Sequence, residues 1–254
     1  AFLWRAPRLI QEQNVFPGTT NRILARLANG IAISFAQSEK YFPPGRTRLT
    51  GNPIRQEFHE MMENAIRPSS APAQSFHLLV TGGSQGAHAI NVAMVEALPH
   101  LEGVKERLRI VHQTGPRDFA WVEERYRETG WKETRVLDFI YDMANRHREA
   151  ELILSRAGAT TLAEITTAGK PAILVPFPFA IHNHQEINAR ALEEAGAAQV
   201  ILNRELTGER LAQAILSLMN HPEQLVEMGK KGKELGRADA AERVVELGYA
   251  LARS

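Results

Sequence analysis

The chain has 254 residues, of which 44% are hydrophobic and 23% charged, and its formal net charge is +1. This composition is typical of a globular protein and argues against disorder, and the low net charge argues against a nucleic-acid-binding protein, which usually has a strongly basic surface. The sequence has no cysteine, which excludes disulfides and thiolate chemistry, and no run approaches the roughly 20 apolar residues of a membrane span, so we expect a cytoplasmic protein without a transmembrane segment.

The first 67 residues are predicted to form a short α/β segment. An extended run at 7–14 is followed by a Gly-Thr-Thr turn, a helix at 21–29, an apolar run at 30–35 and the turn-rich "TGNPIRQEF". These elements are too few for a complete domain, and residue 1 is not Met, so we expect the chain to begin within a domain. A small, polar stretch with prolines at 68–75 predicts a linker.

Residues 76–254 have a more regular pattern. Six apolar runs are each followed by a turn and usually by a helical pattern, and they span residues 76–81, 109–113, 135–139, 151–155, 172–177 and 198–202. This alternation predicts a Rossmann-like α/β domain, with a parallel sheet covered by helices on both faces. Residues 207–253 have helical apolar spacing throughout, and these terminal helices could pack back on the N-terminal part.

The first strand of this regular region runs directly into a glycine-rich turn, "TGGSQG", and then into a helix. Backbone N–H groups at a helix N-terminus bind anions, and the lack of side chains at Gly82, Gly83 and Gly86 would let a diphosphate approach them. The spacing fits neither the dinucleotide fingerprint nor a Walker loop. By itself, the pattern is equally compatible with a turn that packing alone requires.

A second junction of this kind follows the fourth strand. In "SRAGATTLAE", Gly158 provides the turn, Thr160 and Thr161 open a helix, and Glu164 follows about one helical turn later. A carboxylate at this place can accept hydrogen bonds from the two hydroxyls of a ribose. The alternative is a structural glutamate that stabilises the start of the helix through its dipole.

A third junction, "VPFPFAIHNHQE", places polar side chains after the fifth strand. Its amides and imidazoles suit sugar hydroxyls, and ligand sites of open α/β sheets lie at the carboxyl ends of the strands. A metal site built from His182, His184 and Glu186 is the alternative, but no further ligand lies nearby and the chain contains no Asp-x-Asp. We therefore predict neither a metal nor any other cofactor.

Six motifs, in order along nearly the whole chain, resemble those of the MurG family of bacterial N-acetylglucosaminyltransferases. They are "QEQNVFPGTTNRILARLA", "GNPIR", "TGGSQGAHAIN", "DFIYDMA", "SRAGATTLAEITTAGKPAILVPFP" and "HNHQEINARALEEAGAA". The resemblance implies a GT-B glycosyltransferase. Its C-terminal domain, residues 76–254, would hold UDP-N-acetylglucosamine (UDP-GlcNAc), and residues 1–67 would be a remnant of the N-terminal domain that holds the acceptor.

The resemblance also implies roles for individual residues. Ser84 would contact the diphosphate, Ile140 would face the uracil with its backbone, and Glu164 would bind the ribose. Gln185 would reach the GlcNAc hydroxyls. The stretch that would line the nucleotide consists of Ala159, Thr160, Thr161, Leu162, Ala163 and Glu164.

Two further residues, Asn14 and Arg55, would approach the donor from the other side of the cleft. The family's first glycine-rich loop, Gly-Gly-Thr-Gly-Gly-His, has no counterpart in this chain, so most of the N-terminal domain is absent from it. Because the histidine of that loop is the candidate general base, we assign no catalytic residue. We accordingly expect donor binding by this chain, and expect transfer only when the upstream portion is restored.

The implied reaction is inverting transfer of GlcNAc from UDP-GlcNAc to undecaprenyl-diphospho-muramoylpentapeptide (lipid I), giving lipid II for peptidoglycan. Backbone N–H groups rather than a metal would stabilise the leaving diphosphate. The enzyme would act as a peripheral protein on the cytoplasmic face of the plasma membrane, with no nucleic-acid partner. The alternatives are a non-catalytic UDP-sugar-binding fragment and a UDP-sugar 2-epimerase, which shares the general architecture.

Overall fold

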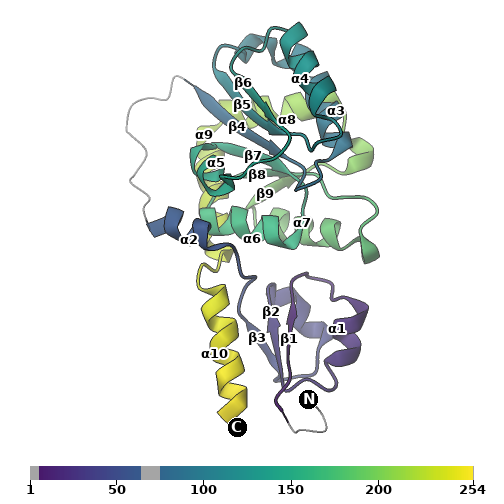
Figure 1. The fold of residues 1–254 in the computed structure, drawn as a ribbon, viewed down its shortest axis with the longest axis vertical. Coiled ribbons are helices and arrows are strands. Elements are labelled where there is room, and N and C mark those ends of the chain that lie inside the picture. The colour runs from purple at the N-terminus through teal and green to yellow at the C-terminus, as the bar shows by residue number, and fades with distance from the viewer. Residues whose placement is uncertain (1–5, 64–74, 254) are drawn as a thin grey trace.

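A computed structural model describes residues 6–63 and 75–253, and it contains two parallel sheets (Figure 1). The smaller sheet belongs to the N-terminal part and the larger one to the region after the gap. Most of the predicted linker, 68–74, lies outside the described residues, so the division into two domains stays a prediction.

The larger sheet has six parallel strands in the order β6-β5-β4-β7-β8-β9. Its strands are β4 (Phe76–Thr81), β5 (Leu108–Gln113), β6 (Thr134–Leu137), β7 (Leu152–Ser155), β8 (Ala172–Leu174) and β9 (Ala198–Val200). All six predicted runs contain a strand, and the Rossmann-like α/β prediction is confirmed. The strand order reverses between β4 and β7, and such a switch point is where open α/β sheets bind ligands, at the carboxyl ends of the strands.

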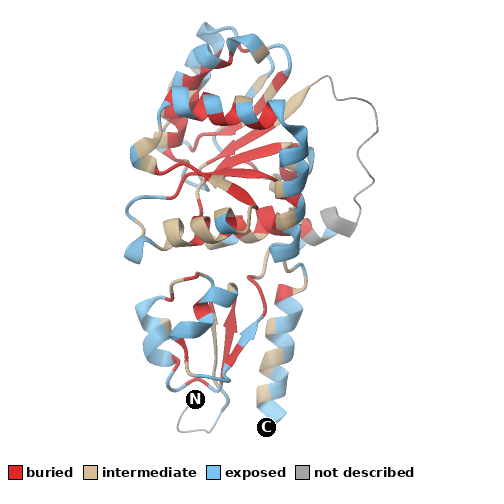
Figure 2. Cartoon of the chain, turned by 180° about the vertical axis from the view of Figure 1, so that it is seen from behind, coloured by how far each residue is buried: buried red, intermediate tan, exposed pale blue. Residues whose placement is uncertain are grey.

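Helices cover both faces of this sheet. Successive side chains of a strand point to opposite faces, so each strand contributes to two cores. In β4, Leu78 and Val80 join a core with helices α3 (His88–Ala97), α4 (Phe119–Glu128) and α8 (Gly208–Asn220). Leu79 joins a second core with helices α6 (Ala159–Ala168) and α7 (His184–Glu194). Figure 2 shows the buried sheet between helices whose outer sides are exposed. The helical segments are α3 (His88–Ala97), η2 (Leu98–Val104), α4 (Phe119–Glu128), α5 (Met143–Glu149), α6 (Ala159–Ala168), η3 (Ile181–Asn183), α7 (His184–Glu194) and η4 (Asn203–Glu205).

The N-terminal part is a three-stranded parallel sheet in the order β1-β2-β3. Its elements are β1 (Leu9–Glu12), α1 (Thr19–Leu24), β2 (Gly30–Ile33), η1 (Ala36–Tyr41), β3 (Thr47–Leu49) and α2 (Gln56–Glu63). The extended run and the apolar run are confirmed as β1 and β2. Helix α1 ends at Leu24 rather than at residue 29, and β3 and α2 were not predicted, because three strand residues and a helix beginning directly after "NPIR" give little periodic signal.

The C-terminal segment forms α8 (Gly208–Asn220), α9 (Pro222–Leu235) and α10 (Ala240–Arg253), in line with its helical spacing. Helix α10 returns to the N-terminal part and lies beside its sheet (Figure 1). The contact is close: a Cβ atom at Gly30 of β2 would lie 2.6 Å from the Leu251 side chain. No helix among the described residues is long and apolar enough to cross a membrane.

Candidate functional site

A hollow of about 490 Å³ lies at the carboxyl ends of β4, β7 and β8, at the switch point of the larger sheet. Residues of all three predicted junctions line it. The hollow therefore brings together segments that lie about 100 residues apart in the sequence. The lining residues are Gly82, Gly83, Gly86, Ala87, His88, Ala89, Arg156, Gly158, Thr161, Phe177, Pro178, Phe179, Gln185 and Asn203.

The three positions of the loop favour glycine for different physical reasons. A Cβ atom at Gly82 would lie 2.2 Å from the Ala87 nitrogen, and one at Gly86 would lie 1.8 Å from the Thr114 carbonyl oxygen. Packing of the loop against backbone therefore requires these two glycines. Gly83 has a φ of +82°, which favours glycine, but a Cβ there would meet nothing within 4 Å. Only Gly83 fits the interpretation that space was left for a ligand.

Hydrogen bonds to neighbouring strands hold the glycine loop in place. The Thr81 hydroxyl donates to Gln113 Oε1 at 2.7 Å and accepts from the Gly83 N–H at 3.3 Å. Gln113 Nε2 donates to the Gly83 carbonyl at 2.9 Å, so one buried amide fixes both sides of the turn. The loop is thus preorganised before any ligand arrives.

Two helix N-termini border the hollow, and neither is capped by a side chain. Helix α3 follows Ala87 and helix α6 follows Gly158, and no side-chain oxygen accepts from the first-turn N–H groups of either helix. Both helices carry a partial positive charge at these ends. The same hollow therefore receives two positive helix ends, an arrangement suited to an anion with two phosphates.

Arg156 adds a full positive charge to this wall, and the sequence reasoning did not assign it a role. Its Nη1 donates to the carbonyls of Val175 and Pro176, each at 3.1 Å, and to Asn203 Oδ1 at 2.9 Å. Burial lowers the pKa of Arg156 to about 10, so the guanidinium stays charged at neutral pH. The sequence did indicate a place at the ligand-binding edge of the sheet, since this arginine directly follows a predicted strand in "SRAG".

Gln185 is held from behind by the ends of two strands. Its Oε1 accepts from the Phe177 N–H at 2.9 Å and from the Ala157 N–H at 3.2 Å. Because the oxygen is engaged, the amide nitrogen is the group that can donate into the hollow. This orientation suits a hydroxyl acceptor, as the predicted contact with a sugar requires.

Glu164 lies on α6 away from the hollow's lining and is only 7% exposed. Its Oε1 accepts from Arg55 Nε at 3.2 Å. Burial raises the pKa of the Glu164 carboxyl, and the charge and hydrogen bond of Arg55 oppose that shift. Arg55 and Glu164, both predicted to contact UDP-GlcNAc, thus lie close together, but they bind each other.

Asn14 is positioned by two buried polar groups. Glu12 Oε1 accepts from the Asn14 backbone N–H at 2.9 Å and from its side-chain amide at 3.2 Å. From α7, the fully buried Asn188 donates to Asn14 Oδ1 at 2.9 Å and accepts from the Val15 N–H at 2.9 Å. Sequence reasoning missed Asn188, which lies one helical turn after Gln185 in "HQEINA".

The remaining predicted residues are spread over different surroundings. Thr161 lines the hollow. Ser84 and Thr160 are exposed and adjoin lining residues in the sequence. The side chain of Ile140 is buried in a core, and the contact of its backbone with the uracil stays a prediction. Residues Ala159, Leu162 and Ala163 line a different cavity of about 270 Å³, between α6 and the N-terminal part. The predicted nucleotide stretch is therefore divided between two cavities, and its role stays a prediction.

The residues considered for a metal have other partners. His182 Nε2 lies 3.3 Å from the Thr19 hydroxyl, and His184 Nδ1 lies 2.7 Å from the Ile181 carbonyl oxygen. Among residues 6–63 and 75–253, no three His, Asp or Glu side chains are grouped so that they could hold a metal ion.

Comparisons with known proteins identify the C-terminal region. Residues 77–244 match the model of the glycosyltransferase family 28 C-terminal domain. A protein of Geobacter sp. (strain M21), named UDP-N-acetylglucosamine–N-acetylmuramyl-(pentapeptide) pyrophosphoryl-undecaprenol N-acetylglucosamine transferase, is 48% identical over 238 residues, which are 94% of this chain and 63% of the relative. A Thermodesulfovibrio yellowstonii protein of the same name is 43% identical over 254 residues, covering the whole chain and 69% of the relative. The chain thus spans just under two thirds of the length of the Geobacter protein.

Solved structures agree with this result. The crystal structure of Acinetobacter baumannii MurG has a TM-score of 0.81 and 33% identity, and the match covers 98% of this chain and 69% of that one. A putative UDP-N-acetylglucosamine 2-epimerase from Listeria monocytogenes has a TM-score of 0.66 at 17% identity, covering 91% of this chain and 62% of that one. The second likeness shows a shared fold alone.

Proposed function

The chain belongs to glycosyltransferase family 28, and from this premise we propose that it binds UDP-GlcNAc and serves the transfer of GlcNAc to lipid I in peptidoglycan synthesis. The names of the Geobacter and Thermodesulfovibrio relatives support this reaction. The donor would lie across the switch point, with its diphosphate in the hollow between the glycine loop and the start of α6.

One observation carries the proposal: two uncapped helix N-termini, a glycine with open space above it and the charged Arg156 meet in a single hollow. Such groups stabilise the negative charge that grows on a diphosphate as it leaves. Gln185, with its amide nitrogen available, would bind the sugar hydroxyls. Glu164 and Arg55 would bind the ribose side of the nucleotide.

The proposed chemistry is a single displacement with inversion. The 4-hydroxyl oxygen of the muramoyl sugar forms a bond to C1 of GlcNAc, and the bond from C1 to the diphosphate oxygen breaks, so that UDP departs with the electron pair. The positive groups of the hollow receive that charge without reorganising, because the loop and both helices are already in place. The hydroxyl proton goes to a base that we do not assign to any described residue.

The decisive experiment combines calorimetry with product analysis. We expect UDP-GlcNAc to bind with a measurable affinity, and UDP-GlcNAc together with lipid I to be the pair of substrates that the complete enzyme converts to lipid II. Binding to a phosphate-free nucleoside as tight as binding to UDP-GlcNAc would contradict the placement of the diphosphate. Conversion of UDP-GlcNAc to UDP-N-acetylmannosamine without an acceptor would instead identify an epimerase.

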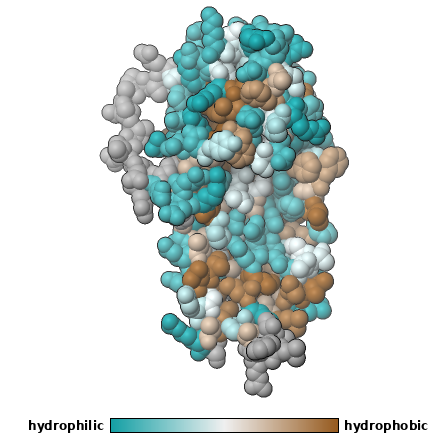
Figure 3. Space-filling model, viewed as in Figure 1, coloured by the Kyte–Doolittle hydropathy of each residue, from teal (hydrophilic) through white to brown (hydrophobic). Residues whose placement is uncertain are grey.

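A surface feature supports a peripheral position on the membrane. The apolar side chains of Ile23, Leu24 and Leu27 are exposed on and just after α1, next to Arg22 and Arg26. Figure 3 shows apolar surface gathered over this N-terminal part of the molecule. Apolar side chains flanked by cations suit an anionic lipid surface, which is consistent with a lipid-linked acceptor on the cytoplasmic face.

A further inference from the structure

His88 is the first residue of α3 and lines the same hollow as Gly83 and Arg156. Its side chain is 73% exposed, and its ring stands edge to face with Trp121, with centroids 6.1 Å apart. Neither the sequence motifs nor the proposed function assigns this histidine a task. Its place at a helix N-terminus that borders the hollow puts a titratable group beside the proposed diphosphate.

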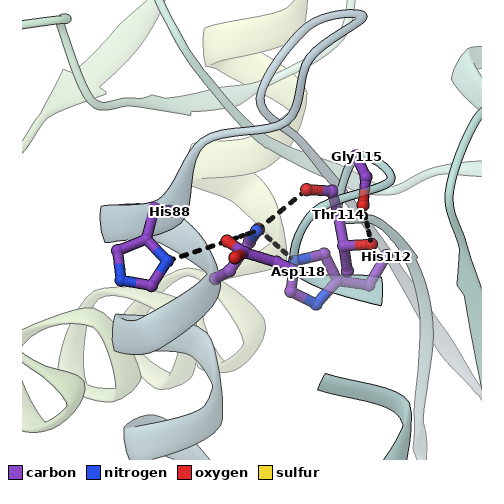
Figure 4. Close-up of polar contacts among 6 residues, drawn as sticks. His88, His112, Thr114, Gly115 and Asp118 are labelled. Carbon is purple, nitrogen blue, oxygen red and sulfur yellow. Dashed lines mark hydrogen bonds and ion pairs between the residues drawn. The ribbon is translucent and has the colours of Figure 1, made fainter. Parts of the chain in front are cut away.

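The orientation of the His88 ring is fixed by Asp118. Nδ1 of His88 lies 2.9 Å from Asp118 Oδ2, and Asn91 Nδ2 donates to the same oxygen at 2.8 Å. Because an aspartate oxygen accepts, Nδ1 carries the proton in this contact. Figure 4 shows the second ring nitrogen on the side of the ring away from Asp118.

Asn91 of α3 connects Asp118 to Thr114, which follows β5 and packs against Gly86 of the glycine loop. Asn91 Nδ2 also donates to the Thr114 carbonyl at 2.9 Å, and Asn91 Oδ1 lies 3.0 Å from His112 Nε2. Burial alone would raise the pKa of the Asp118 carboxyl, but hydrogen bonds from Trp121, Asn91 and His88 bring it below its ordinary value. The lowered pKa favours the charged carboxylate, and hydrogen bonds from Asn91 and His88 hold it beside the ring.

We propose that protonated His88, oriented by Asp118, binds the diphosphate of the donor through its second ring nitrogen. This inference rests on the proposed function and adds a pH-sensitive contact to it. The ionisable groups around the ring are Asp118 beside it and Arg156 across the hollow, while His112 lies behind Asn91 and burial lowers its pKa to about 3. A protonated His88 offsets the negative charge of Asp118, and its second ring nitrogen becomes a hydrogen-bond donor in the hollow that Arg156 also lines.

Calorimetric affinities of UDP-GlcNAc between pH 5.5 and 8.5 test this role, because histidine changes charge in that range whereas the phosphates of a sugar diphosphate do not. We expect the affinity of the unaltered chain to fall by about tenfold across the range, the size of a lost hydrogen bond between charged groups. His88→Gln should bind weakly at every pH. His88→Arg should bind tightly at every pH, because its cation does not titrate.

Uridine, which lacks phosphate, serves as the control ligand and should bind all three proteins equally. If His88→Gln keeps the affinity and the pH profile of the unaltered chain, the proposed contact is wrong. If His88→Arg fails to restore affinity although its thermal unfolding is unchanged, the role of positive charge is wrong. If the folded, unaltered chain binds no UDP-GlcNAc at any pH, the proposed function itself fails, an outcome that differs from loss of the His88 effect alone.

Discussion

Nε of Arg55, which directly precedes α2, lies 3.2 Å from Oε1 of Glu164 on α6, and this ion pair joins the N-terminal part to the region of the larger sheet. The carboxylate proposed for the ribose is thus already engaged. A ribose diol would have to share Glu164 with Arg55 or displace it. Either outcome would couple nucleotide binding to this contact between the N-terminal part and α6.

Glu164→Gln should weaken UDP-GlcNAc binding by about 1.5 to 3 kcal/mol, the usual value for a hydrogen bond to a charged group. The amide keeps one acceptor for Arg55 but cannot accept from both ribose hydroxyls. The measurement is a double-mutant cycle by calorimetry, with the 2′-deoxy analogue of the donor as the second change. The analogue should lose little further affinity on the variant, and full additivity of the two losses would rule out the ribose contact.

Gly83→Ala should fold but lose affinity for UDP-GlcNAc, because the new methyl group and the strain at φ +82° affect the open side of the loop. Gly45 has a φ of +75° and also has nothing within 4 Å of a Cβ, and it lies in the N-terminal part, outside the lining of the hollow. Gly45→Ala is therefore a matched control for the strain, about 1 kcal/mol in each case. Equal donor affinity in the two variants would return Gly83 to a purely structural role.

The outcome at the glycine loop shows what sequence could and could not reveal. Strand, turn and helix were readable from periodicity, since each strand is an apolar run ended by a turn. Whether Gly86 avoids a ligand or a neighbouring backbone depends on Thr114, which follows another strand, β5. Asn188, which donates to Asn14, and Arg55, which pairs with Glu164, lie 174 and 109 residues away in the sequence, so no local pattern could identify these two contacts.

Asn188→Ala should destabilise the protein by about 1 to 3 kcal/mol, since it leaves the Val15 N–H without its acceptor and removes the donor to Asn14 Oδ1. Asn188→Asp keeps an acceptor for Val15 but faces Asn14 Oδ1 with an oxygen instead of a donor. If Asn14 meets the sugar, the Asp variant should lose affinity for UDP-GlcNAc while its affinity for UDP stays the same. Urea unfolding and calorimetry separate the two effects, and equal losses for both ligands would disprove the sugar contact.

The stability of the protein should fall as the pH is lowered below 6.5. Burial lowers the pKa of His112 to about 3, so the folded state keeps this ring neutral while the unfolded chain takes up a proton below its ordinary value of 6.5. The free energy of unfolding therefore decreases between pH 6.5 and about 3, by up to about 1.4 kcal/mol per pH unit from this group, and levels off below that range.

His112→Gln tests this pH dependence, because the amide does not titrate. Urea unfolding at pH 7, 6 and 5 should show a shallower loss for the variant than for the unaltered chain, although buried His147, whose pKa burial also lowers to about 3, keeps part of the slope. Replacement of the exposed His100 by Gln is the control for the substitution itself and is measured at the same three pH values. Identical slopes for His112→Gln and the unaltered chain would count against a neutral buried ring.

Gln185→Glu is expected to separate fold from binding most sharply. One carboxylate oxygen can still accept from the Phe177 and Ala157 N–H groups, so stability should change little, as judged by thermal unfolding. The other oxygen replaces a donor with a negative charge beside the proposed diphosphate, and UDP-GlcNAc affinity should fall by at least about tenfold. Gln185→Ala should lower the stability of the protein, because the Phe177 and Ala157 N–H groups lose their acceptor. Gln224→Glu adds the same charge to the exposed side of α9 and should leave donor affinity intact. Wild-type affinity in a folded Gln185→Glu protein would mean that the donor does not occupy this hollow.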